Sequence, residues 1–241
     1  MVIIYNIREQ VQEEFMQNFG VLVDGKLIET LPKQYREHSL FDYYSQEKDT
    51  FAELFTPELN PSKLFASFSG QLVRKLILPL MGYTMVTHEF CKALSTYLGN
   101  AKVLEIMAGN GILSYGLRQY GTNIIATDIA PWDFPLKPWI PDIEPIDGIQ
   151  AIQKYAHMVD YIIVSWPPMN AELTHIILAL KQIKDINLKI IYIGEDCGGC
   201  TADSAFWELV EPVRDNNFLN VVKSYHTWFG LHDTPYLLEL A

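Results

Sequence analysis

Residues 103–111 constrain the fold of this chain more than any other part of its sequence. An apolar run of strand length, residues 102–106, precedes them, and Leu113 and Leu117 follow at helical spacing. The glycines between the two let the backbone pass close to a ligand, because no Cβ stands in the way. The helix behind them would offer free N–H groups to a carboxylate or phosphate. The stretch therefore predicts a strand, a ligand-binding turn and a helix in succession.

Strands and helices alternate after Gly82. Strands are expected over residues 102–106, 123–128, 159–165 and 188–193, and helices after Thr87, after Gly111 and over residues 171–183 and 202–210. Residues 219–240 are expected to form two strands around a turn at residues 230–233. This alternation indicates an α/β fold with a mostly parallel sheet, to which the terminal hairpin adds an antiparallel edge strand.

Residues 1–82 are predicted to form an N-terminal, mainly helical extension. Asn60-Pro61 is typical of a helix start, with asparagine as the N-cap and proline in the first turn. Apolar residues then follow at intervals of four, at Leu64, Phe68, Leu72 and Leu76. Residues 83–241 are therefore expected to form the main domain.

Charge and composition limit the partners of the chain. Its net charge is -11 over 241 residues, and Lys and Arg form no dense cluster, so no nucleic-acid partner is expected. No apolar run approaches the roughly 20 residues of a membrane-spanning helix, and the N-terminus lacks a signal-peptide pattern. We therefore expect a cytoplasmic protein without a membrane partner. The three cysteines are too few for a four-cysteine zinc site and argue for reduced thiols, so no metal is expected.

Three classes of ligand use a turn of this kind. A phosphate-binding P-loop needs Gly-Lys-Ser or Gly-Lys-Thr after the turn, and the chain has neither. A nicotinamide or flavin site needs a glycine three residues after Gly111, where Ser114 stands. The third class is S-adenosylmethionine. The turn resembles the first motif of class I S-adenosylmethionine-dependent methyltransferases, with Glu105 as the acid of the strand and Gly109 and Gly111 as the last two glycines, whereas Met107 replaces the first glycine.

The resemblance covers about residues 83–241 and implies a Rossmann-like fold. It implies that Asp128 binds the ribose hydroxyls, that Asp147-Gly148 lies near the adenine, and that residues 160–168 form the fourth-strand motif. The cofactor site implied as a whole consists of Glu105, Ala108, Gly109, Gly111, Asp128, Ile129, Asp147, Gly148 and Ser165. Simpler readings remain for some of them: Glu105 as a surface acid, Asp128 as a cap of the next turn, and Asp147-Gly148 as an ordinary turn.

The Trp166-Pro167-Pro168-Met169 segment resembles the catalytic motif of amino-directed methyltransferases in shape only. In that motif an Asn, Asp or Ser side chain holds the target amino group, and an aromatic residue follows the two prolines. Trp166 has no side-chain acceptor, and Met169 replaces the aromatic. What remains is a stiff loop with free carbonyl groups, in which Trp166 is a candidate catalytic residue or simply a packing side chain.

The loop after the strand at residues 188–193 contains Glu195 and a Cys197-Gly198-Gly199-Cys200 motif. Two cysteines at this spacing before a helix can act in thiol redox chemistry, because a helix N-terminus stabilises a thiolate. The alternative is a glycine loop at the carboxyl end of a strand, where ligand crevices form in α/β sheets. Glu195 is then a candidate general base or substrate anchor, or else a solvated loop acid. The segment from Tyr192 to Phe206, with the Trp-Pro-Pro segment, also resembles a little-described methyltransferase-like group.

These observations lead to one main hypothesis and two alternatives. The main one is S-adenosylmethionine-dependent methyl transfer to an unidentified small molecule or protein side chain. The first alternative is a catalytically silent, S-adenosylmethionine-binding regulatory module, which Met107 and Trp166 favour. The second is a thiol redox protein that uses Cys197 and Cys200. The sequence identifies neither the acceptor nor the oligomeric state.

Overall fold

A computed structural model describes residues 82–129, 138–228 and 230–241 of the chain. The predicted helical extension, apart from Gly82, lies outside these residues. Phe229, which falls within the predicted terminal strands, also lies outside them, and the other residues of the predicted sheet are described.

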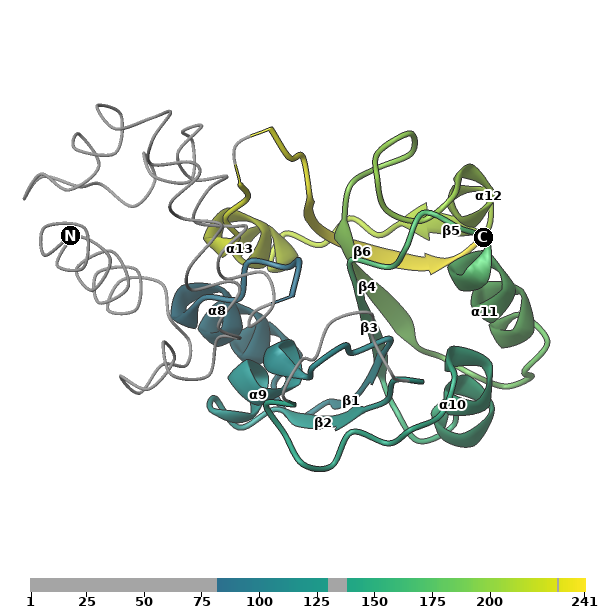
Figure 1. Cartoon of the computed structure of the whole chain (residues 1–241), viewed down its shortest axis with the longest axis horizontal. Helices are drawn as coiled ribbons and strands as arrows, with labels where there is room; N and C mark the ends of the chain where they lie inside the picture. Colours follow the sequence, from purple (N-terminus) through teal and green to yellow (C-terminus); the bar gives the residue numbers. More distant parts are fainter. Residues whose placement is uncertain (1–81, 130–137, 229) are drawn as a thin grey trace, which may run out of the picture.

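The described residues form one sheet of six strands (Figure 1). The strands lie in the order β2-β1-β3-β4-β6-β5, with bounds β1 Lys102–Ile106, β2 Asn123–Ala126, β3 Tyr161–Ser165, β4 Lys189–Gly194, β5 Val210–Pro212 and β6 Thr234–Leu240. The first four strands of this order are parallel, and β6 runs antiparallel to both β4 and β5. The mostly parallel α/β sheet with an antiparallel end is therefore confirmed.

Continuous apolar sequence explains why the central strands lie in the middle of the sheet. In β3 and β4 the side chains of both faces are apolar and almost fully buried, as at Ile162, Ile163, Ile190 and Ile191. A parallel sheet covered on both faces requires such runs, because neither face meets water. The register aligns Ile163 of β3 with Glu105 of β1 and with Ile191 of β4. The register thus places the acidic side chain of Glu105 among the apolar residues of the central strands.

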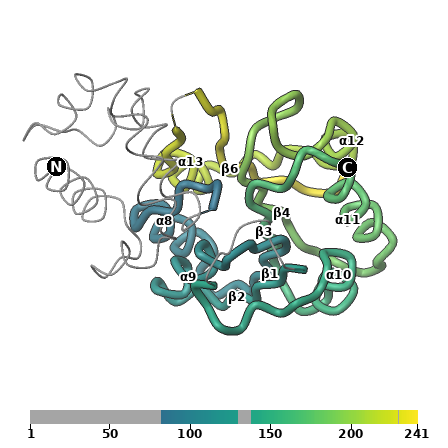
Figure 2. The backbone as a smooth tube through the Cα atoms, viewed as in Figure 1, coloured from purple at the N-terminus to yellow at the C-terminus, as the bar shows by residue number. Residues whose placement is uncertain are grey.

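Helices cover both faces of the sheet (Figures 1 and 2). One face carries α8 His88–Leu98, α9 Ile112–Arg118 and α13 Phe218–Ser224, whose apolar side chains pack in one core cluster. The other face carries α10 Gly148–Tyr155, α11 Glu172–Leu180 and α12 Ser204–Trp207. Of these helices, α9, α10 and α11 are crossover connections, since successive parallel strands need a helix between them.

The predicted ends of α8 are confirmed by its capping contacts. The Thr87 side chain accepts a hydrogen bond from the Phe90 backbone N–H at 3.1 Å, which satisfies one of the donors left open at a helix start. Gly99 ends the helix at a φ of 57°, and its N–H donates to the Ser95 carbonyl. Glycine favours that position because the left-handed backbone region is open to it.

The prediction of two strands over residues 219–240 is wrong. Its first half forms α13, and only β6 follows. Phe218 and Val221 are three residues apart and both face the core cluster beneath α8, so tertiary packing selects a helix there. The predicted helix over residues 202–210 is also too long, because α12 ends at Trp207 and Val210 begins β5. The antiparallel edge strand is therefore β5, and the last strand lies inside the sheet.

Within the described ranges, no helix has the length and apolar character that crossing a membrane requires.

Candidate functional site

The carboxyl ends of the parallel strands bring the predicted site residues to one edge of the sheet. Glu105 lies in β1, Asp128 follows β2, Ser165 ends β3, and Glu195 follows β4. Because β2, β1, β3 and β4 are neighbours and run in the same direction, the loops after them share that edge. In open α/β sheets ligands bind at this edge.

Backbone hydrogen bonds and one carboxylate tie the turn after β1 to the end of β2. The Ala108 N–H donates to the Thr127 carbonyl at 3.0 Å, and the Thr127 N–H donates to the Glu105 carbonyl at 2.9 Å. The Asp128 carboxylate accepts a hydrogen bond from the Gly109 N–H at 2.8 Å. Asp128 is 8% exposed. It therefore fixes the turn, and a carboxylate has acceptor sites for further donors.

The two glycines of the turn are required for different reasons. Gly109 has a φ of 57°, and an added Cβ would meet nothing within 4 Å. Gly111 has a φ of 76°, and an added Cβ would lie 2.8 Å from Ile140 and 2.9 Å from Ile143. Gly111 therefore lets the start of α9 pack against these side chains, whereas Gly109 leaves open space beside the backbone.

Met107 adopts a backbone conformation that favours glycine. Its φ is 55°, in the left-handed region that side chains other than Gly, Asn and Asp rarely occupy. A methionine therefore stands at a position of the turn where glycine would be unstrained. Backbone strain of this kind is found where the surroundings impose a conformation, often at functional sites.

Glu105 is buried in the sheet. It is 1% exposed, so it is not a surface acid, and it accepts a hydrogen bond from the Ser114 hydroxyl of α9. Burial raises the pKa of Glu105 to about 7, although the Ser114 hydrogen bonds act in the opposite direction. The contact joins β1 to α9 beneath the turn. Ser114, which stands where a dinucleotide site would need glycine, has this structural role.

The Asp147-Gly148 pair begins α10. The Asp147 side chain caps the helix by accepting a hydrogen bond from the Gln150 N–H at 2.8 Å. Gly148 is needed for packing, since an added Cβ would lie 2.2 Å from Ile176 Cδ1. These contacts are those of a helix start, and the adenine-binding role of Asp147 and Gly148 stays a prediction.

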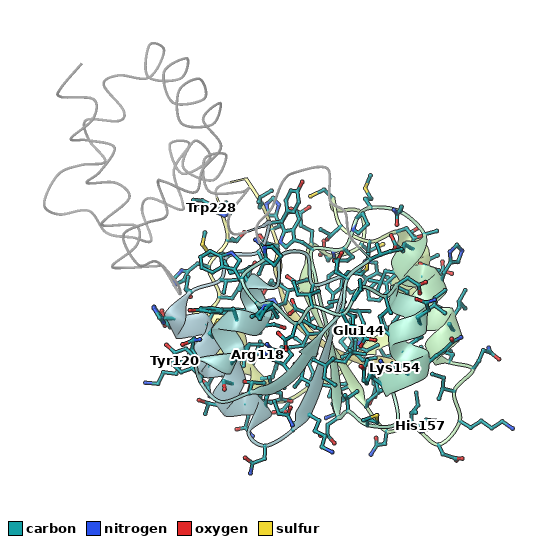
Figure 3. All side chains as sticks on the ribbon, turned by 60° about the horizontal axis from the view of Figure 1, so that its bottom comes forward. Arg118, Tyr120, Glu144, Lys154, His157 and Trp228 are labelled. Carbon is teal, nitrogen blue, oxygen red and sulfur yellow. The ribbon has the colours of Figure 1, made fainter. Side chains whose placement is uncertain are left out.

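A single parallel bridge, Thr127 with Glu144, stands beside β2 where a further edge strand would lie. Glu144 also pairs with Lys154 of α10 at 2.6 Å and accepts a hydrogen bond from Tyr155. Figure 3 shows the Glu144 and Lys154 side chains next to each other. The segment before α10 is thus held against the edge of the sheet close to the Asp128 end of β2.

Two further predicted cofactor residues differ in their surroundings. Ile129, directly after Asp128, is 63% exposed, which gives the edge an apolar side chain beside the carboxylate. Ser165, at the end of β3, is half-buried and hydrogen-bonds through its hydroxyl to Thr84. Thr84 lies before α8, so this bond attaches the start of the described domain to the carboxyl edge of the sheet.

Trp166 is hydrogen-bonded to a carboxylate that no sequence pattern selects. Its indole Nε1–H donates to Asp233 at 3.0 Å, and its backbone N–H donates to the Ile193 carbonyl at 2.8 Å. Asp233 is 3% exposed and also accepts hydrogen bonds from the Tyr225 and Thr227 hydroxyls. In the sequence, Asp233 was one residue of an expected turn, and no local pattern links it to a tryptophan 67 positions earlier.

Glu195 holds two loops together. One carboxylate oxygen accepts the Cys200 N–H at 2.7 Å, and the other accepts the His232 N–H at 2.9 Å. Although burial acts to raise the pKa of Glu195, the hydrogen bonds from Cys200 and His232 outweigh it and keep the pKa below its ordinary value. An ionised carboxylate with both oxygens engaged is suited to fixing loops. The roles of Glu195 as a general base or substrate anchor remain predictions without support from these contacts.

Cys197 and Cys200 are exposed and are not joined in a disulfide. The helix that follows them, α12, begins at Ser204, has four residues and is capped by the Asp203 side chain. The thiols therefore lie in a loop ahead of the helix and not in its first turn, which is where a helix N-terminus would stabilise a thiolate.

Comparisons with known proteins yield structural neighbours only. No protein-family model and no curated protein sequence matches the chain. A ribosomal protein L11 methylase from Lactobacillus delbrueckii subsp. bulgaricus is 14% identical with a TM-score of 0.38, over 64% of this chain and 76% of its own. TehB from Haemophilus influenzae is 11% identical with a TM-score of 0.39, over 69% and 66%. A SAM-dependent methyltransferase from Bacteroides fragilis, solved with S-adenosyl-L-homocysteine, is 14% identical with a TM-score of 0.37, over 63% and 77%.

These TM-scores lie below 0.5, so the fold of the chain is defined by the order and direction of its own strands. Four parallel strands carry the candidate site at their carboxyl ends, and β6 runs antiparallel between β4 and β5. The chain therefore has a Rossmann-like α/β fold, with a mostly parallel sheet and an antiparallel strand β6 between β4 and β5.

Proposed function

We propose that the chain binds S-adenosylmethionine at the edge formed by residues 105–111 and Asp128, and that it transfers the methyl group to an acceptor. The observation that carries this proposal is the contact between Asp128 and Gly109. It places a carboxylate at the end of β2 beside a turn whose glycine has open space where a Cβ would be. The ribose hydroxyls of the ligand need a carboxylate to accept their hydrogen bonds, and the rest of the ligand needs open backbone to lie against. Asp128 and Gly109 provide these two features side by side.

The residues present fit the cofactor in chemical type. The Asp128 carboxylate would accept hydrogen bonds from the ribose hydroxyls, and the backbone at Ala108 and Gly109 would lie against the ligand. Ile129, which is exposed beside Asp128, would provide an apolar contact for the adenine. The bound cofactor supplies an electrophilic methyl group on a sulfonium. The protein contributes alignment of donor and acceptor, which alone can account for a large part of the rate of such a displacement.

Titration calorimetry of the full chain tests binding. S-adenosylmethionine and S-adenosylhomocysteine are expected to bind and to raise the melting temperature, and NAD is not. A chain that binds NAD and neither of the other two would contradict the proposal. Transfer of labelled methyl groups to candidate acceptors then separates an enzyme from a binding module.

The second candidate is a module that binds the cofactor without turnover. The observation that favours it is the pair Met107 and Trp166. Both stand where the methyltransferase motifs have other residues, and both adopt left-handed backbone, with φ of 55° and 50°. Such a module would show cofactor binding of ordinary affinity and no methyl release with any acceptor tested.

A further inference from the structure

Trp166 is fixed by three parts of the chain that are distant in sequence. Its backbone N–H is bound by Ile193 in β4, its indole N–H by Asp233 before β6, and its ring stacks on Tyr83 at 5.5 Å between centroids and 18° between planes. It keeps a left-handed backbone, with a φ of 50°, that is unfavourable for a bulky side chain. Such a conformation persists only where several contacts impose it.

The Trp166–Tyr83 pair lies at the surface, on the same edge of the sheet as the candidate cofactor turn. Tyr83 is 45% exposed and Trp166 is half-buried. Trp166 directly follows Ser165, the end of β3, and β3 pairs with β1, which leads into the turn. A tryptophan that served only to fill the core would be expected among the fully buried apolar side chains, and Trp166 is not one of them.

The indole is backed by negative charge. Among the described residues, the groups that donate hydrogen bonds to the Asp233 carboxylate, from Trp166, Tyr225 and Thr227, are neutral, so they solvate the charge without cancelling it. A carboxylate that accepts the indole N–H draws positive charge toward that edge of the ring and makes the ring face more attractive to a cation. A second carboxylate, Glu195, binds the backbone N–H of His232, the neighbour of Asp233.

We propose that the methyl acceptor carries an amino group, and that the rings of Trp166 and Tyr83 receive the positive charge that its nitrogen gains on methylation. This inference rests on the proposed function. Asp233 is a positioning residue in it, because it acts through Trp166.

During the methyl transfer, positive charge moves to the acceptor nitrogen, which explains why the aromatic rings of Trp166 and Tyr83 would stand next to it. The neutral amine forms a bond from its lone pair to the methyl carbon, the carbon–sulfur bond breaks with its electron pair going to sulfur, and a proton then leaves the nitrogen for water. Positive charge thus passes from sulfur to nitrogen. An aromatic face attracts the partly charged nitrogen of the transition state more than the neutral amine, which is the difference that accelerates a reaction.

The test uses tetramethylammonium as the probe and the full chain labelled with ¹⁵N. The chain has five tryptophans, and the indole N–H signal of Trp166 is identified as the one lost in Trp166→Phe. We expect tetramethylammonium to shift that signal in a saturable manner and tert-butanol, a neutral molecule of similar shape, to leave it unchanged. The Trp139 indole, which pairs with Tyr115 at 5.7 Å, serves as the internal reference.

Two matched variants examine the contact without disturbing the core. Tyr83→Leu removes the exposed ring and should weaken tetramethylammonium binding by about two- to fivefold, the range of an exposed cation–π contact. Tyr83→Phe keeps the ring and should bind as the parent does. Asp233→Asn should weaken binding and move the Trp166 signal even without the probe, and the other indole signals report whether that variant is folded.

The outcomes separate this inference from the proposed function. If S-adenosylmethionine binds but tetramethylammonium shifts the Trp166 signal no more than tert-butanol does, the amine acceptor is wrong and the cofactor site stands. Equal binding by Tyr83→Leu and the parent would also overturn the inference. If S-adenosylmethionine does not bind, the proposed function fails, and the assignment of the aromatic pair to a methyl acceptor fails with it.

Discussion

The Asp128 carboxylate accepts the backbone N–H of Gly109 at 2.8 Å, across 19 positions of sequence. The bond joins the carboxyl ends of β1 and β2 and places a charged group beside a glycine with open space around it. A carboxylate can accept more than one hydrogen bond. The residue therefore has a structural role in the turn as well as the proposed role toward a ribose, and variants at this position have to separate the two.

Asp128→Asn should separate these roles. The amide oxygen can still accept the Gly109 N–H, so we expect little change in melting temperature. The charge-assisted bonds to the ribose hydroxyls are lost, which should weaken S-adenosylmethionine binding by about 1–2 kcal/mol, against about 2–4 kcal/mol for Asp128→Ala. Calorimetry measures both affinities. Parent-like affinity in a folded Asp128→Asn and Asp128→Ala would remove Asp128 from the cofactor site.

Gly109→Val should produce a folded protein that does not bind S-adenosylmethionine, because a branched side chain would fill the space beside the turn. Gly121→Val is the matched control. Both glycines have positive φ, 57° and 86°, and an added Cβ meets nothing within 4 Å at either, so the backbone strain is comparable. Gly121 lies between α9 and β2, at the opposite edge of the sheet. If both variants bind like the parent, the ligand lies elsewhere.

The buried Glu105 should make stability depend on pH. Burial raises its pKa from 4.5 to about 7, so between these pH values the folded protein holds a proton that the unfolded chain has released. The free energy of unfolding therefore falls as the pH rises through this window and levels off above it. Glu105→Gln keeps an acceptor for Ser114 without the charge. It should be more stable than the parent above pH 7, by on the order of 1–3 kcal/mol.

Urea unfolding of both proteins at several pH values from 4.5 to 8 measures this difference. The Glu105→Gln curve should change less with pH than that of the parent. Parallel curves for the two proteins would show that Glu105 does not titrate in this range.

The left-handed backbone of Met107 should decide which substitutions the turn tolerates. Asn is accepted at positive φ, whereas a β-branched residue is not. We therefore expect Met107→Val to lower the free energy of unfolding by about 1–2 kcal/mol more than Met107→Asn, although valine is the more apolar residue. Chemical denaturation gives the order of the two variants. The reverse order would mean that packing of the Met107 side chain outweighs the backbone conformation.

Nucleic acid should not bind to the chain. The net charge of -11 repels phosphates at long range. Trp166 offers no side-chain acceptor to a base amino group, and its indole N–H is already bound to Asp233. Fluorescence anisotropy at physiological salt is expected to show no binding to duplex DNA or structured RNA. Micromolar binding that weakens steeply with added salt would contradict this prediction.

Much of the fold could be predicted because its signals are local. The apolar runs of β1, β3 and β4, the Thr87 cap and the glycine at the end of α8 each depend on a few consecutive residues. The errors occurred where neighbours in space decide the outcome. Residues 218–224 can be read as a strand from their apolar content, and they form α13 because one side of that helix packs against α8.

In the candidate site, too, the residues with local sequence signals could be predicted, and the contacts between distant segments could not. The sequence predicted that Glu105, Gly109 and Asp128 lie at strand ends or in the turn that follows one, and the structure places them there; their cofactor-binding role stays a prediction. It did not identify Asp233 or the stacking of Tyr83 on Trp166, because those contacts join segments separated by tens of residues. Nor did it reveal the two backbone donors to the Glu195 carboxylate, whose role as a general base stays a prediction.

The sequence by itself determined the order of the elements from α8 to β2 and the position of the glycine turn between them, because hydrophobic periodicity and backbone freedom act within a few residues. Only the tertiary structure decided which polar side chains became charged, buried or bound. Burial sets the pKa of Glu105, and the approach of β6 between β4 and β5 brings Asp233 to Trp166. Desolvation and hydrogen bonding depend on all the atoms around a group, and most of those atoms belong to residues distant in sequence.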